Sequence, residues 1–192
     1  MIAGVELRIA RPDDAPSIRT IYAPYVERSV ISFETEPPDV ATMLARMNKV
    51  LPQHPWLVAT VAGEIAGYAY AGPHRERAAY RWSVDVTAYL DDRFHRRGIG
   101  RRLYDALCTL LQTQHIANAF GLVTLPNAAS AALHESCGFV RCATETRVGY
   151  KFGAWHDVGV WQKQLSSDVA TPIEPISFSD LPAAAVAEVL AR

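Results

Sequence analysis

Apolar residues recur along this chain with two different periods. In residues 103–111 they follow the i, i+3, i+4, i+7, i+8 spacing of one helix face, which predicts an amphipathic helix with a buried stripe. Residues 5–10 instead alternate apolar and polar, which is typical of a short strand. From Pro55, the run P-W-L-V-A-T-V-A, a Gly63-Glu64 turn and the run I-A-G-Y-A-Y-A predict a β-hairpin. We expect this hairpin to form the centre of a sheet.

Turn and capping residues place the remaining elements. Asp14 can cap a helix that runs to about Val26. Asp39 can cap a second helix, because the paired prolines before it exclude regular helix. Strands are also predicted at residues 81–90, 119–125, 139–148 and 154–165, and a helix at residues 128–136. The last two strands are expected to pair antiparallel.

The composition of the chain changes after residue 165. Residues 166–179 are rich in turn formers and include Pro172 and Pro175, which predicts a linker. Residues 180–192 could form a short helix that docks on this chain or on a partner, or could fray. We therefore expect one domain over residues 1–165, followed by a linker and a short tail over residues 166–192.

One stretch, Ser83 to Leu111, joins a strand with a lone carboxylate to a basic, glycine-containing turn and then to the amphipathic helix. Gly98 and Gly100 stand among arginines where the helix should begin. Backbone N–H groups, the helix dipole and positive side chains would then face one point, which favours an anion site for phosphates. The alternative is a solvated basic helix start, which is the usual explanation of a run of charges.

Three other features have two explanations each. Asp85 in the middle of a strand is either a solvent-facing residue or a general base in a cleft. Phe33, in a loop before two prolines, is either a lid over a pocket or a hydrophobic plug. The loop with Arg75, Arg77 and Tyr80 is either an exposed basic flap or the place where an acidic substrate group binds.

Composition excludes some classes of protein. Among 192 residues, 19 Lys and Arg nearly balance 20 Asp and Glu, so a net charge of -1 gives no general attraction to nucleic acid or to an anionic membrane. Three cysteines without C-x-x-C spacing suggest neither a disulfide framework nor a metal site, and they fit a reducing, cytoplasmic setting. The sequence shows neither a signal-peptide pattern nor an apolar run of membrane-spanning length.

The order of elements and the motif H-R-R-G-I-G from His95 resemble the GCN5-related N-acetyltransferase (GNAT) superfamily. The cofactor motif of that family is Gln or Arg, two variable residues, Gly, one variable residue, and Gly or Ala. The spacing matches here, while His stands at the first position. The resemblance implies an α/β (α+β) fold in which a central mixed, mostly antiparallel sheet with splayed strands is flanked by helices. It also implies acetyl-CoA as co-substrate and no metal.

Within this superfamily, residues 6–165 look most like the phosphinothricin and methionine sulfoximine acetyltransferases. The similarity lies in short segments such as F-E-T-E-P from Phe33, Y-A-Y-A-G-P from Tyr68, L-H-E-S-C-G-F from Leu133 and G-Y-K-F-G-A-W-H-D from Gly149. The resemblance implies direct transfer of an acetyl group to the α-amine of a small amino-acid analogue. It also implies a homodimer.

The resemblance assigns roles to individual positions. Asp85 falls where the family has a catalytic glutamate, and a bridging water could make up for its missing methylene. His134 falls where many relatives have a tyrosine that protonates the leaving thiolate; a structural histidine is the alternative. The implied cofactor-binding positions are Ala88, Tyr89, Leu90, His95, Arg96, Arg97, Gly98, Ile99, Gly100, Arg101 and Asn127, and the implied substrate-binding positions are Phe33, Arg75, Arg77 and Tyr80.

Three alternative functions stay open. The same fold could acetylate another amine or a protein N-terminus. A non-catalytic module could bind acyl-CoA, and the replacement of Glu by Asp favours it. Nucleic-acid binding through the arginine turn would be strongly salt-dependent, but the near-zero net charge weighs against it.

Overall fold

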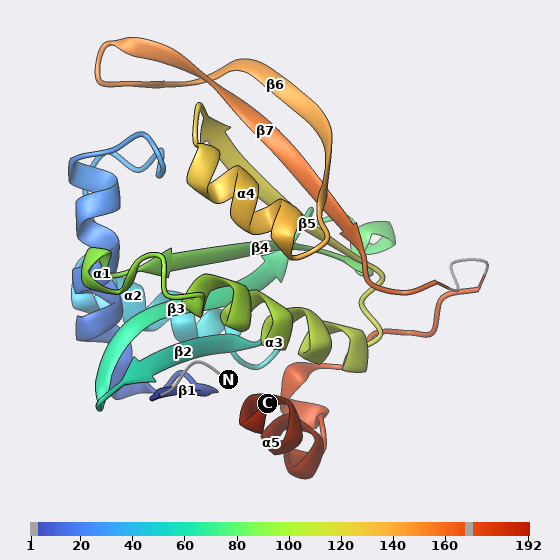
Figure 1. Ribbon diagram of the computed structural model, residues 1–192. Coiled ribbons are helices and arrows are strands. Elements are labelled where there is room, and N and C mark those ends of the chain that lie inside the picture. The colour runs from blue at the N-terminus through green and yellow to red at the C-terminus, as the bar shows by residue number, and fades with distance from the viewer. Residues whose placement is uncertain (1–3, 168–170) are drawn as a thin grey trace.

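The computed structural model describes residues 4–167 and 171–192. These residues contain a mixed sheet of seven strands (Figure 1). Its spatial order is β1-β2-β3-β4-β5-β7-β6. The hairpin β2–β3 was expected at the centre of the sheet, and this is wrong: β4 is the central strand, because β5 carries the β7–β6 pair on the far side. The strands are β1 (Val5–Ile9), β2 (Trp56–Val61), β3 (Glu64–Pro73), β4 (Ser83–Leu90), β5 (Asn118–Leu125), β6 (Val140–Lys151) and β7 (Ala154–Gln164).

Neighbouring strands pair antiparallel except for β4 and β5, which are parallel and pair over three positions only. Asp85 opposite Phe120 is the last of these pairs. Beyond it, residues 86–90 continue to pair with β3, and residues 121–125 continue to pair with β7. We call this divergence, with residues 86–90 on one side and 121–125 on the other, the β4–β5 fork. The predicted mixed, mostly antiparallel sheet with splayed strands is thus confirmed.

Helices cover both faces of the sheet. On one face α1 (Ala15–Glu27) and α2 (Val40–Val50) pack against Trp56, Val58 and Tyr68. On the other face α3 (Ile99–Thr113) packs against Leu57 and Ala59. Alternate residues of β2 therefore enter two different cores, which explains why its sequence is apolar almost throughout.

A short helix, α4 (Ala128–Ser136), follows β5, and its His134 lies against that strand. The long β6–β7 hairpin projects from the rest of the molecule (Figure 1). All residues of β6 are exposed except Gly149, which is half-buried, and Lys151, which is buried, since β6 is the edge strand of the sheet.

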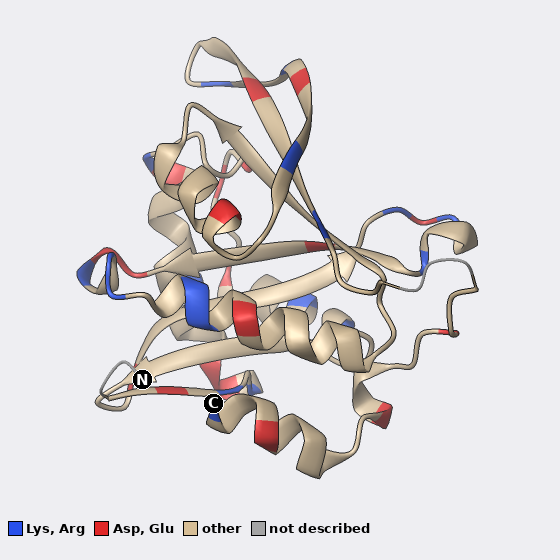
Figure 2. Ribbon diagram, turned by 45° about the vertical axis from the view of Figure 1, so that its right-hand side comes forward, with Lys and Arg blue, Asp and Glu red and all other residues tan. Residues whose placement is uncertain are grey.

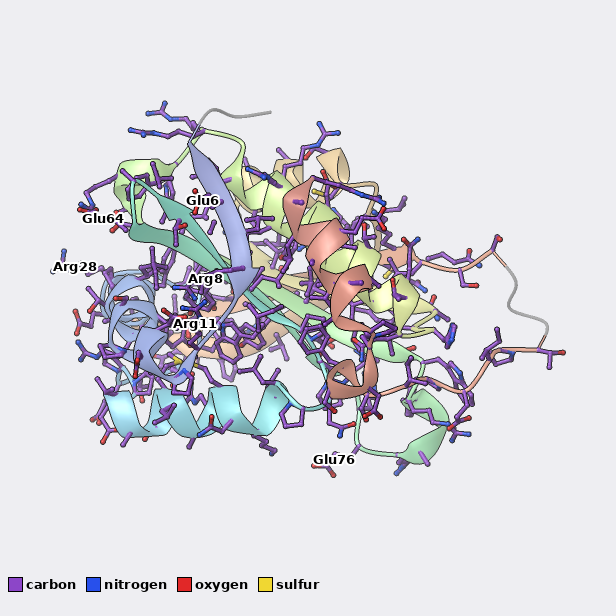
Figure 3. The ribbon with its side chains drawn as sticks, turned by 90° about the horizontal axis from the view of Figure 1, so that it is seen from below. Glu6, Arg8, Arg11, Arg28, Glu64 and Glu76 are labelled. Atoms are coloured by element: carbon purple, nitrogen blue, oxygen red, sulfur yellow. The ribbon has the colours of Figure 1, made fainter. Side chains whose placement is uncertain are left out.

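The C-terminal helix α5 (Ala183–Ala191) docks on this chain. Figure 3 shows it lying across α3 beside β1, and Val189 is buried there. Before α5, the indole N–H of Trp82 donates to the Ile173 carbonyl over 2.7 Å, and the Gln114 amide donates to the Ile176 carbonyl over 2.9 Å. These bonds hold the tail against the loop before β4 and the end of α3. The division of the chain at residue 165 stays a prediction.

None of the helices described has the length and apolar character needed to cross a membrane.

Candidate functional site

Asp85 stands at the base of the β4–β5 fork. It is the last residue of β4 that pairs with β5, and its side chain is 35% exposed. Its Oδ1 lies 2.6 Å from Nδ1 of His74, which follows the end of β3. The antiparallel register of β3 and β4 places Gly72 directly opposite Asp85, so the chain two residues later still lies within reach of the carboxylate.

His74 is held in a fixed orientation. Its ring stacks on Phe120 of β5, with the ring centres 4.2 Å apart and the planes 16° from parallel. Tyr80 meets the same ring edge-on at 6.2 Å, and the His74 backbone N–H donates to the Ser83 carbonyl. His74 was not singled out from the sequence. The available signal was its position, because it is the first titratable residue after residues 65–71, the strand expected directly before the strand of Asp85.

Burial raises the pKa of the Asp85 carboxyl group above its ordinary value. The hydrogen bond from His74 and the charges of His74 and Arg75 oppose this shift but do not cancel it. Asp85 is therefore a stronger base than a solvated aspartate, and it is accessible enough to meet a ligand.

The start of α3 has the features of an anion site. Gly98, the residue before the helix, has φ = 72°, a left-handed conformation that glycine adopts without strain. The first helical N–H groups, of Ile99, Gly100 and Arg101, have no partner within the helix. The first turn contains no acidic residue, and Figure 2 shows basic residues, together with the acidic Asp91 and Asp92, along the β4–α3 connection. A phosphate fits this set of donors.

The arginines around this helix start have different surroundings. Arg102 donates to the Val5 carbonyl of β1, and Arg101 lies 3.7 Å from Asp105. Arg97 lies over the ring of Phe94 at 5.4 Å, and Arg96 is exposed with φ = 59°. The backbone N–H groups and the guanidinium groups of Arg96 and Arg97, which form no ion pair within residues 4–167 and 171–192, are thus what this turn offers to an anion.

The end of β4 is fixed close to that turn. The Tyr25 hydroxyl donates to the Leu90 carbonyl over 2.6 Å, and His95 Nε2 lies 3.1 Å from the same hydroxyl. Burial raises the pKa of Tyr25 to about 12, so the hydroxyl keeps its proton. Ala88, Tyr89 and Leu90 pair with β3 on one side only, and their other edge faces the fork. Their implied contact with a cofactor stays a prediction that this placement permits.

Asn127 lies at the other arm of the fork, directly after β5. Its Oδ1 accepts a hydrogen bond from the Ser130 backbone N–H over 3.0 Å and so caps α4. Its side-chain NH₂ group makes no hydrogen bond to the part of the chain that the structure describes. The cofactor contact expected of Asn127 stays a prediction.

His134 is buried beneath β5. Its Nδ1 lies 2.8 Å from the Ser130 carbonyl, and its Nε2 lies 3.2 Å from the Tyr104 hydroxyl. A Cβ atom at Gly121 would lie 2.2 Å from the His134 ring, so only glycine allows this contact. Both ring nitrogens already have partners and the residue is 3% exposed, which favours the structural alternative over a proton donor.

The implied substrate residues fall into two groups. Arg75, Arg77 and Tyr80 lie in the exposed loop between His74 and β4. Phe33 lies instead against Gly149 of β6, in the loop after α1, and among the described residues no contact joins it to the other three.

Lys151 fixes the Phe33 loop to the end of β6. The lysine is buried, and its ammonium group donates to the carbonyls of Val26 and Ser32, each over 2.7 Å. Phe33 itself is 38% exposed. Both predicted roles of Phe33, a lid over a ligand beside the β6–β7 hairpin and a hydrophobic plug, therefore stay predictions.

In residues 4–167 and 171–192, no three His, Cys, Asp or Glu side chains are grouped so that they could hold a metal ion.

The thiols of Cys108 and Cys137 are buried, and burial raises the pKa of Cys108 to about 12. Cys108 is therefore a structural thiol rather than a reactive one.

Comparison with known proteins gives a consistent family. A family model described as an acetyltransferase (GNAT) domain matches residues 7–160. The phosphinothricin N-acetyltransferase of Streptomyces viridochromogenes is 37% identical over 174 residues, which cover 90% of this chain and 95% of that protein. The L-methionine sulfoximine/L-methionine sulfone acetyltransferase of Pseudomonas aeruginosa is 32% identical over 171 residues, covering 88% and 99%.

A solved structure agrees with these sequences. The crystal structure of a GNAT superfamily phosphinothricin acetyltransferase from Sinorhizobium meliloti, in complex with AcCoA, superposes with a TM-score of 0.86 at 31% identity. It covers 93% of this chain, and this chain covers 98% of it.

Replacing His134 by glutamine tests its role. Burial lowers the pKa of His134, so below about pH 6.5 the unfolded state binds a proton more readily than the folded state. Stability is therefore lost as pH falls, by about 1.4 kcal/mol per unit of pKa difference. In His134→Gln the free energy of unfolding should fall less between neutral and mildly acidic pH. The fall should not vanish, because burial lowers the pKa of His54 too.

Chemical denaturation at both pH values measures this difference, and an unchanged pH dependence would contradict it. Turnover of the same variant should stay within a few-fold of the wild type. A loss of about a hundredfold or more in a stably folded variant would instead support the proton-donor role.

Proposed function

The chain belongs to the GNAT acetyltransferases, and from this we propose that it is an acetyl-CoA-dependent N-acetyltransferase acting on the α-amine of a small amino-acid analogue, such as phosphinothricin or methionine sulfoximine. The observation that carries the proposal is the β4–β5 fork, with a basic carboxylate at its base and an anion site beside the end of β4. Acetylation would inactivate such toxic analogues, so a detoxifying role is part of the proposal.

The residues at the fork fit acetyl-CoA. The N–H groups at the start of α3 would bind its pyrophosphate, with Arg96 and Arg97 adding positive charge. The free edge of residues 88–90 offers backbone groups to the amides of the pantetheine arm, apart from the Leu90 carbonyl, which already accepts from Tyr25. When bound, acetyl-CoA supplies a thioester whose carbonyl carbon an amine can attack. The related Sinorhizobium meliloti enzyme, solved with AcCoA, supports this assignment.

The proposed base is the Asp85 side chain, whose carboxylate removes a proton from the substrate ammonium group. An ammonium group has no lone pair and must lose a proton before it can attack. Burial raises the pKa of Asp85, and its partial exposure leaves it open to a substrate. Attack then forms the C–N bond as the C–S bond breaks, without a covalent enzyme intermediate. The buried Cys108 and Cys137 are poorly placed to act as nucleophiles, which agrees with direct transfer.

The loop after His74 supports a small acidic acceptor. Arg75 is close enough for its charge to act on Asp85, and Arg77 and Tyr80 follow in the same loop. Guanidinium groups bind carboxylate or phosphinate oxygens in a bidentate way. A substrate held there by its acidic group would have its amine near the base of the fork.

The proposed function also includes a homodimer that forms through the β6–β7 hairpin. The β6–β7 hairpin exposes five large apolar side chains, between 50% and 70% exposed: Val140, Val148, Tyr150, Phe152 and Trp155. Tyr150 and Trp155 pack together at the tip of this hairpin with ring centres 5.4 Å apart, and Phe152 lies in the turn between them. Exposed aromatic side chains of this kind are typical of a protein interface. The three free cysteines fit a reducing compartment, so we place the protein in the cytoplasm, with neither nucleic acid nor membrane as a partner.

A thiol-release assay with acetyl-CoA tests the function. Phosphinothricin and methionine sulfoximine should release free thiol with kcat/KM at least about tenfold above that of peptides with free N-termini, because only the small acidic amines match the arginine loop. Methionine serves as the matched control that lacks the second acidic or polar head group. A preference for peptides would shift the function to another acceptor. Binding of acetyl-CoA without thiol release from any amine would identify a non-catalytic module.

Sedimentation velocity tests the dimer. The wild type should sediment as a dimer at micromolar concentration, and Trp155→Lys should shift it toward monomer because a charge would be buried in the apolar contact. Ile173→Lys is the matched control, since Ile173 is also exposed, at 66%, but lies in the tail. A monomeric wild type, or a dimer that Trp155→Lys leaves intact, would contradict the hairpin interface.

A further inference from the structure

The hydrogen bond between His74 and Asp85 defines how each group can act. An ionised carboxylate only accepts hydrogen bonds, so across the 2.6 Å contact Nδ1 of His74 must carry the hydrogen. In a neutral imidazole the other nitrogen, Nε2, then has a free lone pair. Within residues 4–167 and 171–192, Nε2 of His74 has no hydrogen-bond partner. The ring thus presents one unsatisfied acceptor.

Three strands meet at this pair. His74 follows the end of β3, Asp85 lies on β4, and Phe120, on whose ring His74 stacks, lies on β5. Since Asp85 and Phe120 form the last pair before the strands diverge, His74 lies at the base of the fork. Its side chain is 16% exposed, so it is shielded but not closed off.

We propose that His74 accepts the proton of the substrate ammonium group at Nε2, while Asp85 orients the ring and stabilises the imidazolium. The inference rests on the proposed function and refines its base: the charge of Asp85 acts through His74. This arrangement extends the reach of the short aspartate side chain by the width of an imidazole ring. An imidazole ring can accept a proton at Nε2 while its Nδ1–H keeps the hydrogen bond to Asp85, and the carboxylate then faces the positive charge that forms.

The proton and electron balance is simple. The ammonium N–H bond gives its proton to Nε2, and the electron pair stays on the amine nitrogen. That pair forms the C–N bond to the thioester carbonyl carbon, and the C–S bonding pair leaves with sulfur. The attacking nitrogen still carries one proton more than the amide product, and it loses that proton to the leaving thiolate, which gives the free thiol. The proton on His74 passes to solvent, which restores the neutral ring.

Few other ionisable groups face the pair. Arg75 in the following loop and Tyr70 on β3 interact electrostatically with Asp85, and Tyr80 lies edge-on to His74. From β5 the contact is Phe120, which does not titrate. The acid limb of the pH–rate profile should therefore be set mainly by His74 and Asp85 as a coupled unit.

Nitrogen NMR of the imidazole ring tests the pair without any reaction. In the free wild-type protein above neutral pH, His74 should be the Nδ1–H tautomer, and Asp85→Asn should change the tautomer ratio. The Nε2–H tautomer in the wild type would overturn the proposal.

Kinetics test the proton transfer. His74→Gln and Asp85→Asn should each lower kcat by about a hundredfold or more, with acetyl-CoA affinity within about twofold, and the double variant should be little worse than either. His74→Gln should also displace the acid limb of the kcat–pH profile, which a merely structural residue would leave in place. His115→Asn, at an exposed histidine after α3, is the control and should keep wild-type kcat.

The outcomes separate this inference from the proposed function. If the wild type is active and His74→Gln keeps kcat within about threefold, or keeps the acid limb, His74 is not the base. If only Asp85→Asn is inactive, Asp85 acts alone and the proposal is overturned. If the wild type releases no thiol from any amine, the proposed function fails, and the tautomer measurement then decides whether the His74–Asp85 pair exists. If His74→Gln does not fold, His74→Asn and the wild-type spectra carry the test.

Discussion

The short parallel pairing of β4 and β5 is the constraint on which the rest of the structure depends. The two strands pair from Ser83 to Asp85 and then diverge, while each keeps its partner on the far side. Their facing edges past Asp85 therefore carry backbone groups without a strand to pair with, and such groups need a partner or water. A ligand with its own amide groups can supply that partner. The base of the fork is where such a ligand would end and where a reactive group is most useful.

Both arms of the fork are fixed from outside. On the β4 side, the Leu90 carbonyl accepts hydrogen bonds from Tyr25 and His95. These hydrogen bonds also hold the end of β4 close to the start of α3. On the β5 side, His134 packs against Gly121 and is itself bonded at both ring nitrogens. His134, which the family resemblance placed in the chemistry, and His95, which it placed at the cofactor, thus help to shape the fork. His74, which the resemblance did not indicate, contacts the Asp85 carboxylate instead.

Local patterns predicted much of this. The helical spacing of residues 103–111, the hairpin from Pro55 and the Gly98 turn are each set by neighbours in sequence, and each is found. What could not be predicted depends on register and strand order. His74 meets Asp85 only because Gly72 pairs opposite it, and β4 is central only because β7 and β6 add beyond β5. Phe33 lies apart from Arg75 because Lys151 ties its loop to β6.

We propose that acetyl-CoA lies along the fork with its phosphates at the start of α3. Amide hydrogen exchange with and without acetyl-CoA tests it directly, because a bound ligand slows exchange of the N–H groups that it covers. With acetyl-CoA bound, exchange should slow at Ile99 and Gly100 and along residues 88–90, with little change in β1. Unchanged exchange at both places, under conditions where calorimetry shows acetyl-CoA bound, would contradict it.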